Sequence, residues 1–330
     1  MLRRNLAVAA LLSLCGLSLP AQAVQRAFVS AISGNDANTA TGCAASAPCR
    51  WFAGAITAVD PNGEIVAMDS GAYGAVTITK SVSIIGAPGV YAGITVFSGD
   101  GVTIATPGVK VVLRGLAING LGGSDGIVLT SGASLTVDRC VISNFPSGYG
   151  LYVGTAATVA VLDSLVTRSS HGAQLTGGAT ATVSRSRFLG NSGDGLLVSQ
   201  TSSGTTTVSV SQSEASGNGT SGFAASTSDG GTARLDIRDS VASGNGSAGF
   251  FAASSTGTTQ MSVSTSLASG NLHGLYSYGS ATLTAGGNTV TRNTTGLKQG
   301  SSGVLESSGD NIVRGNTIAS SGTITAVSKM

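Results

Sequence analysis

The heptapeptides GNGTSGF, residues 217–223, and GNGSAGF, residues 244–250, are nearly the same sequence, written twice 27 residues apart. Their shared pattern is an asparagine, a short turn, a glycine and an apolar residue. It recurs through most of the chain and is interrupted at Ser169. The asparagines are Asn119, Asn144, Asn191, Asn218, Asn245, Asn271 and Asn293. The matching glycines, Gly126, Gly150, Gly172, Gly195, Gly222, Gly249, Gly274 and Gly296, are 22 to 27 residues apart. A period of this length is typical of a solenoid.

The residues between the repeated motifs decide which solenoid is expected. Leucine-rich repeats need a dense leucine framework, whereas the apolar positions here are Val, Leu, Phe and Ala among Ser and Thr. Stretches such as ATVAVLDSLV and ARLDIRDSVAS alternate with a period of two and favour strands, and Gly, Ser, Asn and Asp clusters between them indicate turns. No segment from 65 to 330 has a helical stripe. We therefore predict an all-β parallel β-helix of about ten coils.

The repeated asparagine has a physical role in such a fold. Coils stack about 4.8 Å apart, so an Asn at the same corner of each coil can pass amide hydrogen bonds along the stack. We expect a ladder of Asn144, Asn191, Asn218, Asn245, Asn271 and Asn293. The next glycine would supply a backbone conformation closed to other residues. The apolar residues that follow it would form an inward stack of Leu151, Ala173, Leu196, Phe223, Phe250, Leu275 and Leu297. A second inward row is expected at Ser164, Ser186, Ser213, Ser240 and Ser266.

The first 23 residues have the pattern of a secretory signal peptide. Two arginines precede an apolar run, and Ala21-Gln22-Ala23 resembles a cleavage signal. We expect a secreted or periplasmic protein without membrane insertion, because the apolar run is short of the roughly 20 residues that a spanning helix needs. Removing Arg3 and Arg4 reduces 17 basic residues to 15, against 15 acidic ones. This neutral balance argues against nucleic acid as a partner.

Composition and cysteines add two expectations. Charged residues make up 10% and hydrophobic residues 41% of the chain, a balance that favours a folded protein over disorder. Three cysteines lie beyond the signal peptide, and two of them are close together in the loop-like stretch CAASAPC. In an oxidising compartment we predict a Cys43–Cys49 disulfide with Cys140 free.

The N-terminal part also resembles a known superfamily. RAFVSAISGNDANTATGCAASAPCRWFAGAI, followed by GEIVAMDSGAYGAVTITKSVSIIG, is similar to the start of secreted bacterial right-handed parallel β-helix proteins of the pectin-lyase-like superfamily. With the later coils, the resemblance covers nearly all of the mature chain. It implies a right-handed solenoid over 64–330 and a capping segment over 24–63. A helix with Pro48 in its first turn would direct Trp51 or Phe52, with Ala55, Ile56 and Val59, onto the first coil.

The superfamily includes pectate lyases, polygalacturonases and members without known activity, so the fold does not decide the function. The pairs His171-Gly172 and His273-Gly274 are like one polygalacturonase motif, but the Asp-Asp and Arg-x-Lys motifs are missing. Each His also occupies a repeat position that other residues fill elsewhere. We therefore do not transfer polygalacturonase chemistry to this chain.

One set of charged residues could carry lyase or hydrolase chemistry. Counting back from the Asn corner places Asp138, Asp163 and Arg185 in one outward column, with the two carboxylates on adjacent coils about 5 Å apart. Under this hypothesis they are catalytic, and the carboxylates could hold calcium. The alternative is scattered surface charge, in which Arg185 only offsets the pair. Arg187 and Glu214 are expected to form a surface ion pair.

Two groups of aromatic residues could contact a sugar. Tyr149 and Tyr152 are predicted to lie near His171 and Asp194, which are neighbours in one column. Phe251, Tyr276 and Tyr278 could form a second platform, although isolated surface aromatics would look the same in a sequence. The sequence has no phosphate loop, zinc spacing or EF-hand loop, so no cofactor or metal is expected.

Two functional hypotheses follow. The first is a non-catalytic extracytoplasmic scaffold that binds or organises polysaccharide or another cell-surface partner. The alternative is a polysaccharide lyase or glycoside hydrolase that acts on an acidic glycan. We favour the first because the loops are too short to wall a catalytic groove. The sequence does not predict the oligomeric state.

Overall fold

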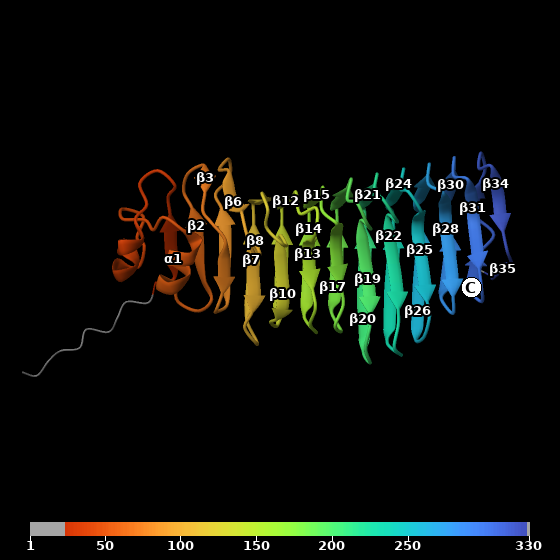
Figure 1. Ribbon diagram of the computed structural model, residues 1–330, viewed down its shortest axis with the longest axis horizontal. Coiled ribbons are helices and arrows are strands. Elements are labelled where there is room, and N and C mark those ends of the chain that lie inside the picture. Colours follow the sequence, from red (N-terminus) through yellow and green to blue (C-terminus); the bar gives the residue numbers. More distant parts are fainter. Residues whose placement is uncertain (1–23, 329–330) are drawn as a thin grey trace, which may run out of the picture.

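The computed structural model describes residues 24–328, which form a single elongated solenoid of three parallel sheets. Coils stack along the long axis from the N-terminal to the C-terminal end (Figure 1). Each coil contributes one strand to sheet A, a short strand to sheet B and one strand to sheet C, as β11, β12 and β13 illustrate. The predicted signal peptide, residues 1–23, lies outside the described residues.

Every pairing within the three sheets is parallel. Sheet A consists of β1 (Arg26–Val29), β2 (Gly63–Ala67), β5 (Val82–Gly86), β8 (Lys110–Arg114), β11 (Ser134–Asp138), β14 (Thr158–Leu162), β17 (Thr180–Ser184), β20 (Thr205–Ser211), β23 (Thr232–Arg238), β26 (Thr258–Ser264), β29 (Thr282–Gly286), β32 (Val304–Ser307) and β35 (Ile324–Ala326). Sheet B consists of β3 (Gly71–Ala72), β6 (Ala92–Val96), β9 (Leu116–Gly120), β12 (Val141–Ser143), β15 (Leu165–Thr167), β18 (Arg187–Leu189), β21 (Glu214–Ser216), β24 (Val241–Ser243), β27 (Leu267–Ser269), β30 (Thr289–Thr291) and β33 (Ile312–Val313). Sheet C consists of β4 (Val76–Ile78), β7 (Val102–Ala105), β10 (Ile127–Ser131), β13 (Tyr149–Val153), β16 (His171–Leu175), β19 (Leu196–Gln200), β22 (Phe223–Thr227), β25 (Ala248–Ser254), β28 (His273–Gly279), β31 (Thr295–Gly300) and β34 (Ile318–Ser321).

The predicted apolar stack is confirmed in the interior of sheet C. Its members pair coil by coil and are buried: Leu151, Ala173, Leu196, Phe223, Phe250, Leu275 and Leu297. The rings of Phe223 and Phe250 are stacked with centroids 5.7 Å apart. Alternating side chains of sheet A complete the core from the opposite side, as the burial pattern of β20 shows.

The serine row is buried as predicted, and it forms a second hydrogen-bonded ladder. Each backbone N–H donates to the Ser Oγ of the next coil, from Cys140 to Ser164 and onward to Ser266. The row then continues through two asparagines, Asn288 and Asn311. Because these groups are buried, each unmade bond would leave a desolvated donor.

The asparagine ladder is present, with one correction. From Asn191 to Asn293, each backbone N–H and each Nδ2 donates to the Oδ1 of the next Asn, and the ladder ends at Asn316. Asn144 is not a member: it aligns with Gly190, and the ladder position of that coil holds the buried Phe145. Asn144 has a φ of 65°. Asparagine is favoured in that left-handed conformation as well as in a ladder, which explains the one-residue shift.

The repeated glycine is needed for space rather than for an unusual dihedral angle. Gly195 is not among the residues with positive φ. A Cβ on it would lie 2.6 Å from the carbonyl oxygen of Gly222 and 2.8 Å from Nδ2 of Asn218. The expectation that this glycine adopts a backbone conformation closed to other residues is therefore wrong. The close approach of the next coil excludes every side chain.

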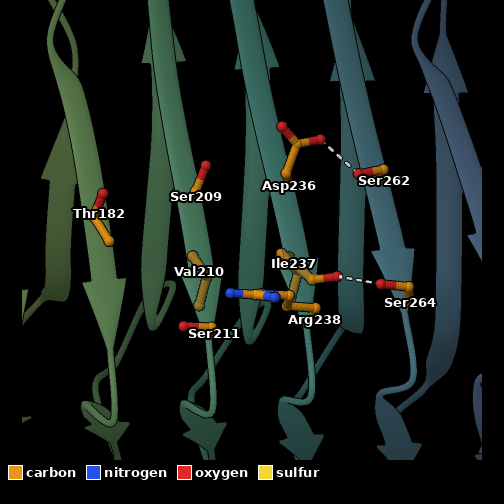
Figure 2. A pocket seen from close by; sticks show the side chains of 9 residues that line it. All are labelled: Thr182, Ser209, Val210, Ser211, Asp236, Ile237, Arg238, Ser262 and Ser264. Carbon is orange, nitrogen blue, oxygen red and sulfur yellow. Dashed lines mark hydrogen bonds between the residues drawn. The ribbon is translucent and has the colours of Figure 1, made fainter.

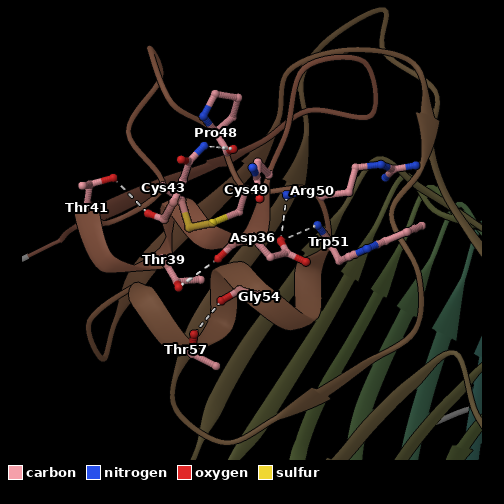
Figure 3. The surroundings of a disulfide bond; sticks show 12 residues. Asp36, Thr39, Thr41, Cys43, Pro48, Cys49, Arg50, Trp51, Gly54 and Thr57 are labelled. Carbon is pink, nitrogen blue, oxygen red and sulfur yellow. Dashed lines mark hydrogen bonds between the residues drawn. A yellow bond between two sulfur atoms is a disulfide. The ribbon is translucent and has the colours of Figure 1, made fainter.

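The N-terminal segment combines a strand, a disulfide and two short helices. β1 already pairs with β2, so sheet A begins at Arg26 and not at residue 64. The predicted disulfide joins Cys43 to Cys49 (Figure 3). A 3₁₀ helix, η1 (Asp36–Thr41), precedes it, and the Oδ1 of Asp36 accepts the backbone N–H groups of Arg50 and Trp51.

The predicted helix is α1 (Phe52–Ala58), which buries Phe52, Ala55 and Ile56. Trp51 is its N-terminal flanking residue and is 40% exposed, so Phe52 supplies the inward aromatic ring. Pro48 lies before the helix instead of in its first turn. The Pro48 carbonyl accepts hydrogen bonds from Asn35 and Asn38 and so belongs to the disulfide loop.

Candidate functional site

The charged set predicted from the sequence lies at the corner between sheets A and B, but its residues do not form one column. Asp163 and Arg185 occupy equivalent positions in adjacent coils, whereas Asp138 pairs with Leu162 and lies one residue earlier. Arg139 fills the corner position of that coil. The error follows from counting back from Asn144, which stands one residue before the true ladder position.

Both carboxylates of this corner have arginine partners. Asp163 accepts two hydrogen bonds from Arg185, at 2.8 and 2.9 Å, and this pairing lowers the pKa of Asp163. Asp138 lies 2.8 Å from Arg114 and 3.4 Å from Arg139. The predicted surface pair of Arg187 and Glu214 is present at 3.3 Å. Arg185 thus neutralises Asp163, and the two carboxylates do not stack to share a cation.

The outer face of sheet C carries a different set of side chains. One outward position recurs in successive coils and is called here the outer column. Its members, in register from coil to coil, are Val128, Tyr152, Gln174, Leu197, Ala224, Phe251, Tyr276 and Lys298. Most are half-buried, so their side chains lie against the sheet. The column is therefore apolar or aromatic at most of these positions, polar at Gln174 and cationic at Lys298, and Ser321 follows Lys298 in register.

The proximal cluster, Tyr149, Tyr152, His171 and Asp194, confirms the neighbourhood predicted from the sequence. The rings of Tyr149 and Tyr152 have centroids 5.2 Å apart, and those of Tyr149 and His171 are 5.5 Å apart. The Nε2 of His171 is 3.9 Å from Oδ2 of Asp194, and Oδ1 of the same carboxylate accepts hydrogen bonds from the next coil. Asp125 borders the cluster, and burial raises the pKa of its carboxyl group.

The distal cluster consists of Phe251, His273, Tyr276, Tyr278 and Lys298. The Tyr276 ring packs against Phe251, His273 and Tyr278, with centroids 5.1, 5.0 and 6.0 Å away. The Lys298 ammonium lies 4.5 Å from the centroid of the same ring. These aromatic residues therefore form one contiguous cluster, with the rings tilted or edge-on to one another, and are not isolated.

His273 and Lys298 are the polar residues of the distal cluster. Lys298 Nζ donates to His273 Nε2 at 2.9 Å. Burial, and then the nearby Lys298 charge, lower the pKa of His273. Among residues 24–328, no carboxylate lies within ion-pair distance of Lys298. The cation is thus held by a neutral imidazole and an aromatic face, and no carboxylate of the described residues pairs with it.

Sheet A has a hollow of its own on its outer face. Figure 2 shows that it is lined mainly by hydroxyl groups, with Asp236 and Arg238 among them. Asp236 accepts a hydrogen bond from Ser262 at 2.5 Å. The hollow contains no aromatic side chain, so it lacks the flat apolar surface on which a sugar ring could stack.

Two negative findings apply to residues 24–328. They contain no group of three or more His, Cys, Asp or Glu side chains arranged to hold a metal ion. They also contain no helix that is long and apolar enough to cross a membrane.

Sequence comparison matches residues 93–266 to the right handed beta helix region family, just over half of the 330 residues. The chain belongs to the right-handed β-helix family. This confirms the fold and the handedness predicted from the sequence. No curated protein matches this chain.

Two solved structures resemble this β-helix. Pectate lyase Pel9A is 18% identical with a TM-score of 0.57, and the alignment covers 85% of this chain and 76% of that one. The A-module of the mannuronan C-5 epimerase AlgE4 from Azotobacter vinelandii is 14% identical with a TM-score of 0.61, and it covers 81% and 91%. At these identities the similarity establishes the shared fold.

The contact between His273 and Lys298 was not predicted, although the sequence contains a signal for it. Each member of the outer column from Tyr152 to Lys298 stands two residues after a repeated glycine, so counting from Gly274 and Gly296 aligns Tyr276 with Lys298. His273 precedes Gly274 directly. Alignment on the asparagines instead directed attention to the corner with Asp163 and Arg185.

Proposed function

We propose that the outer face of sheet C binds a polysaccharide. The observation that carries this proposal is the outer column, which presents aromatic and apolar side chains on successive coils. Tyr and Phe rings offer flat apolar faces on which sugar rings stack, and tyrosine hydroxyls supply hydrogen bonds at the edge. The hollow on the outer face of sheet A lacks these rings.

The charge of the distal cluster favours a polymer that carries carboxylates. Lys298 has no acidic partner among the described residues, and the Tyr276 ring and neutral His273 hold its ammonium at the surface. A ligand carboxylate would pair with this cation in a partly desolvated position, where a charged hydrogen bond is stronger than in water.

The similar folds support the proposal by analogy. Their names concern pectate and mannuronan, two polysaccharides, although low identity gives no information about ligands. The predicted secreted or periplasmic location would bring the chain to such polymers. The Cys43–Cys49 disulfide is consistent with that location.

The proposal is tested by affinity electrophoresis of the chain from Val24 onward through gels that contain polygalacturonate, polymannuronate or neutral xylan. We expect retardation by at least one of the two acidic polymers and little by xylan. Lys298→Met should reduce the retardation, and Lys110→Met, which removes an exposed lysine of sheet A, should not. No retardation by any polymer would reject the proposal.

A lyase is the second candidate, and His273 is the observation that favours it. Its lowered pKa keeps the imidazole neutral at neutral pH. If a substrate carboxylate replaced His273 as the hydrogen-bond acceptor of Lys298, Nε2 of His273 would be free to remove the proton on the sugar carbon next to that carboxylate. The sugar–oxygen bond at the neighbouring carbon would then break, leaving an unsaturated sugar, while a proton passes to the leaving oxygen.

This chemistry is checked by following the ultraviolet absorbance of an unsaturated product, with and without calcium. A lyase centred on the distal cluster loses activity in His273→Gln and keeps it in Asp163→Ala. The reverse result would place the chemistry at the corner predicted from the sequence. A chain that binds but produces no unsaturated sugar is a binding protein.

A further inference from the structure

We infer that two copies of this chain associate through the outer faces of their B sheets, with the solenoid axes antiparallel. The two-fold axis would run parallel to the strands and pass between Arg187 and Glu214. This inference goes beyond the proposed function, because sheet C is not part of the face. It commits to a second copy of the same chain as the partner and to one orientation.

Sheet B carries an outward column of its own, called here the B column. The sheet lies along the upper edge of the solenoid in Figure 1, where β12, β15, β21, β24 and β30 are labelled. The members of the B column, in register from coil to coil, are Ala117, Val141, Leu165, Arg187, Glu214, Val241, Leu267, Thr289 and Ile312. Val141 is 43% and Ile312 is 57% exposed, and the other members are exposed or half-buried. Sheet B therefore presents apolar side chains to solvent.

The order of residues in the B column is self-complementary. The ion pair of Arg187 and Glu214 has two apolar residues on each side, which are Val141 and Leu165 before it and Val241 and Leu267 after it. A reversed copy has the same spacing, because every coil advances by about 4.8 Å. Reversal about the ion pair sets Arg187 opposite Glu214 of the partner subunit and Leu165 opposite Val241 of the partner subunit. Opposite charges and apolar groups then meet along the column.

Parallel arrangements of the two copies fit less well. In register, Arg187 would face Arg187 of the partner subunit, and these like charges would repel each other. A shift by one coil would bring Arg187 to Glu214 of the partner subunit, but the two remaining charges would then lie against Leu165 and Val241, where they lack partners. Such a shifted contact is also heterologous and does not close into a dimer. The antiparallel arrangement avoids both faults.

The surface beside the B column allows close approach of a second face. The next outward column of sheet B consists mainly of hydroxyl groups: Asn119, Ser143, Thr167, Leu189, Ser216, Ser243, Ser269 and Thr291. A two-fold axis parallel to the strands keeps this column opposite its own counterpart. At the adjoining corner, four successive coils have glycine: Gly190, Gly217, Gly244 and Gly270. These glycines have no side chain that would hold the two faces apart.

The central ion pair can accept a second pair. Within residues 24–328, the contact joins Nε of Arg187 to Oε2 of Glu214 at 3.3 Å. It uses one nitrogen of the guanidinium and one oxygen of the carboxylate, so the other atoms can meet the partner subunit. Two copies would close a neutral network of two arginines and two glutamates. The additional charged hydrogen bonds offset the desolvation that burial of the charges costs.

The size of the face indicates a weak and reversible dimer. Ala117 and Ile312 are separated by eight coil steps. The face is therefore about 38 Å long and roughly 12 Å wide, and two copies would bury roughly 900 Å² in total. This area lies at the low end for specific interfaces, so we expect a monomer–dimer equilibrium that depends on concentration.

Sedimentation equilibrium of the chain from Val24 onward, over a wide range of protein concentrations, tests the association. We expect the average mass to rise from that of the monomer toward twice that value. Leu165→Lys should weaken the dimer about tenfold or more, because it places a charge opposite an apolar residue. Val304→Lys, at a valine of sheet A that is 39% exposed, is the matched control and should leave the dimer unchanged. Circular dichroism checks that each variant folds.

Charge reversal tests the centre of the face. Arg187→Glu and Glu214→Arg should each weaken self-association, because like charges then meet across the two-fold axis. An equimolar mixture of the two variants should associate again, because the charges of one variant complement those of the other. Failure of the mixture to associate, when the wild type does, would overturn the central role of this pair.

Cross-linking with a short bismaleimide tests the orientation. In the antiparallel dimer, positions 165 and 241 face each other across a gap of roughly 10 Å, so Leu165→Cys mixed with Val241→Cys should cross-link. Leu165→Cys alone should not, because its two thiols would be three coils and roughly 17 Å apart. The native cysteines do not interfere, because Cys43 and Cys49 form a disulfide and Cys140 is buried.

Three results would overturn the inference. The first is a monomer at every concentration, which would leave this face to another partner or to none. The second is a dimer that Leu165→Lys does not weaken, because the contact would then lie elsewhere. The third is cross-linking of Leu165→Cys alone as readily as in the mixture, which would exclude the antiparallel orientation. None of these results bears on polysaccharide binding by sheet C, so the two proposals fail separately.

Discussion

The Nζ of Lys298 lies 2.9 Å from Nε2 of His273, and this contact defines the protonation state of the imidazole. An ammonium can only donate, so Nε2 must accept and the imidazole proton must be on Nδ1. Among the described residues, Nδ1 is buried and has no hydrogen-bond partner. His273 is therefore a neutral group held beside a cation, and protonating it would place two positive charges in contact.

The first prediction concerns the pKa of His273. Because the sequence contains only two histidines, both imidazoles can be followed by NMR. We expect His273 to titrate below the ordinary value of about 6.5, since burial and Lys298 both oppose its charged form. Lys298→Met should raise this pKa, and Lys110→Met should leave it unchanged. A His273 pKa at or above the ordinary value would show that the contact does not exist.

The same shift makes the stability depend on pH. The pKa of His273 is lower in the folded than in the unfolded protein, so the unfolded chain takes up this proton first as the pH falls. The free energy of unfolding should therefore decrease below pH of about 6.5 and level off below the folded pKa. Urea titrations across this range should show a smaller decrease for His273→Gln. If the free energy of unfolding decreased equally in His273→Gln and in the wild type, groups other than His273 would cause the pH dependence.

The asparagine ladder should contribute strongly to stability. Asn245 is 2% exposed, and its Oδ1 accepts both the backbone N–H and the Nδ2 of Asn218. Its own Nδ2 donates to Ala215 and Asn271. Asn245→Ala would leave several buried groups unpaired and should reduce the free energy of unfolding by about 3–5 kcal/mol. Urea denaturation measures the change.

Asn144 provides the matched control, because it lies one residue before the ladder position. Asn144→Gly keeps the left-handed conformation accessible and should change stability by no more than about 1 kcal/mol. If Asn144→Gly and Asn245→Ala were equally destabilising, the one-residue correction would be wrong.

Cys140 should be unreactive in the native protein. It occupies the head of the serine ladder, where its backbone N–H donates to Ser164, and burial raises the pKa of its thiol to about 11. In a chain that starts at Val24, Ellman's reagent should modify no thiol until denaturant is added, and then about one equivalent. Rapid modification of the folded protein would contradict this burial.

Much of the fold could be predicted because the sequence repeats and each repeat corresponds to one coil. A solenoid places the same residue type at the same corner in every coil, so Asn218, Asn245 and Asn271 reveal the stack by their spacing alone. The inward stack, the serine row and the disulfide follow from the same alignment and composition. The prediction was wrong where one residue type suits two positions of the coil. Asn144 occupies the left-handed position and not the ladder position, which is one residue later.

The rest depended on backbone geometry and on contacts between coils. Asp163 and Arg185 adopt positive φ at the tight corner between sheets A and B, although arginine is not a residue that favours it. The corner imposes that conformation, so local sequence gives no sign of it. Likewise, the contact of His273 with Lys298 depends on the register of β28 and β31 and on burial, which a residue list does not show.

The most direct test of the account is equilibrium binding of polygalacturonate and polymannuronate to the wild type, Tyr276→Ala and Tyr91→Ala. Tyr276 is the centre of the distal cluster, whereas Tyr91 is exposed and lies outside the outer column. The account predicts that at least one polymer binds the wild type and Tyr91→Ala equally, and binds Tyr276→Ala about tenfold or more weakly. Equal binding to all three proteins would contradict it.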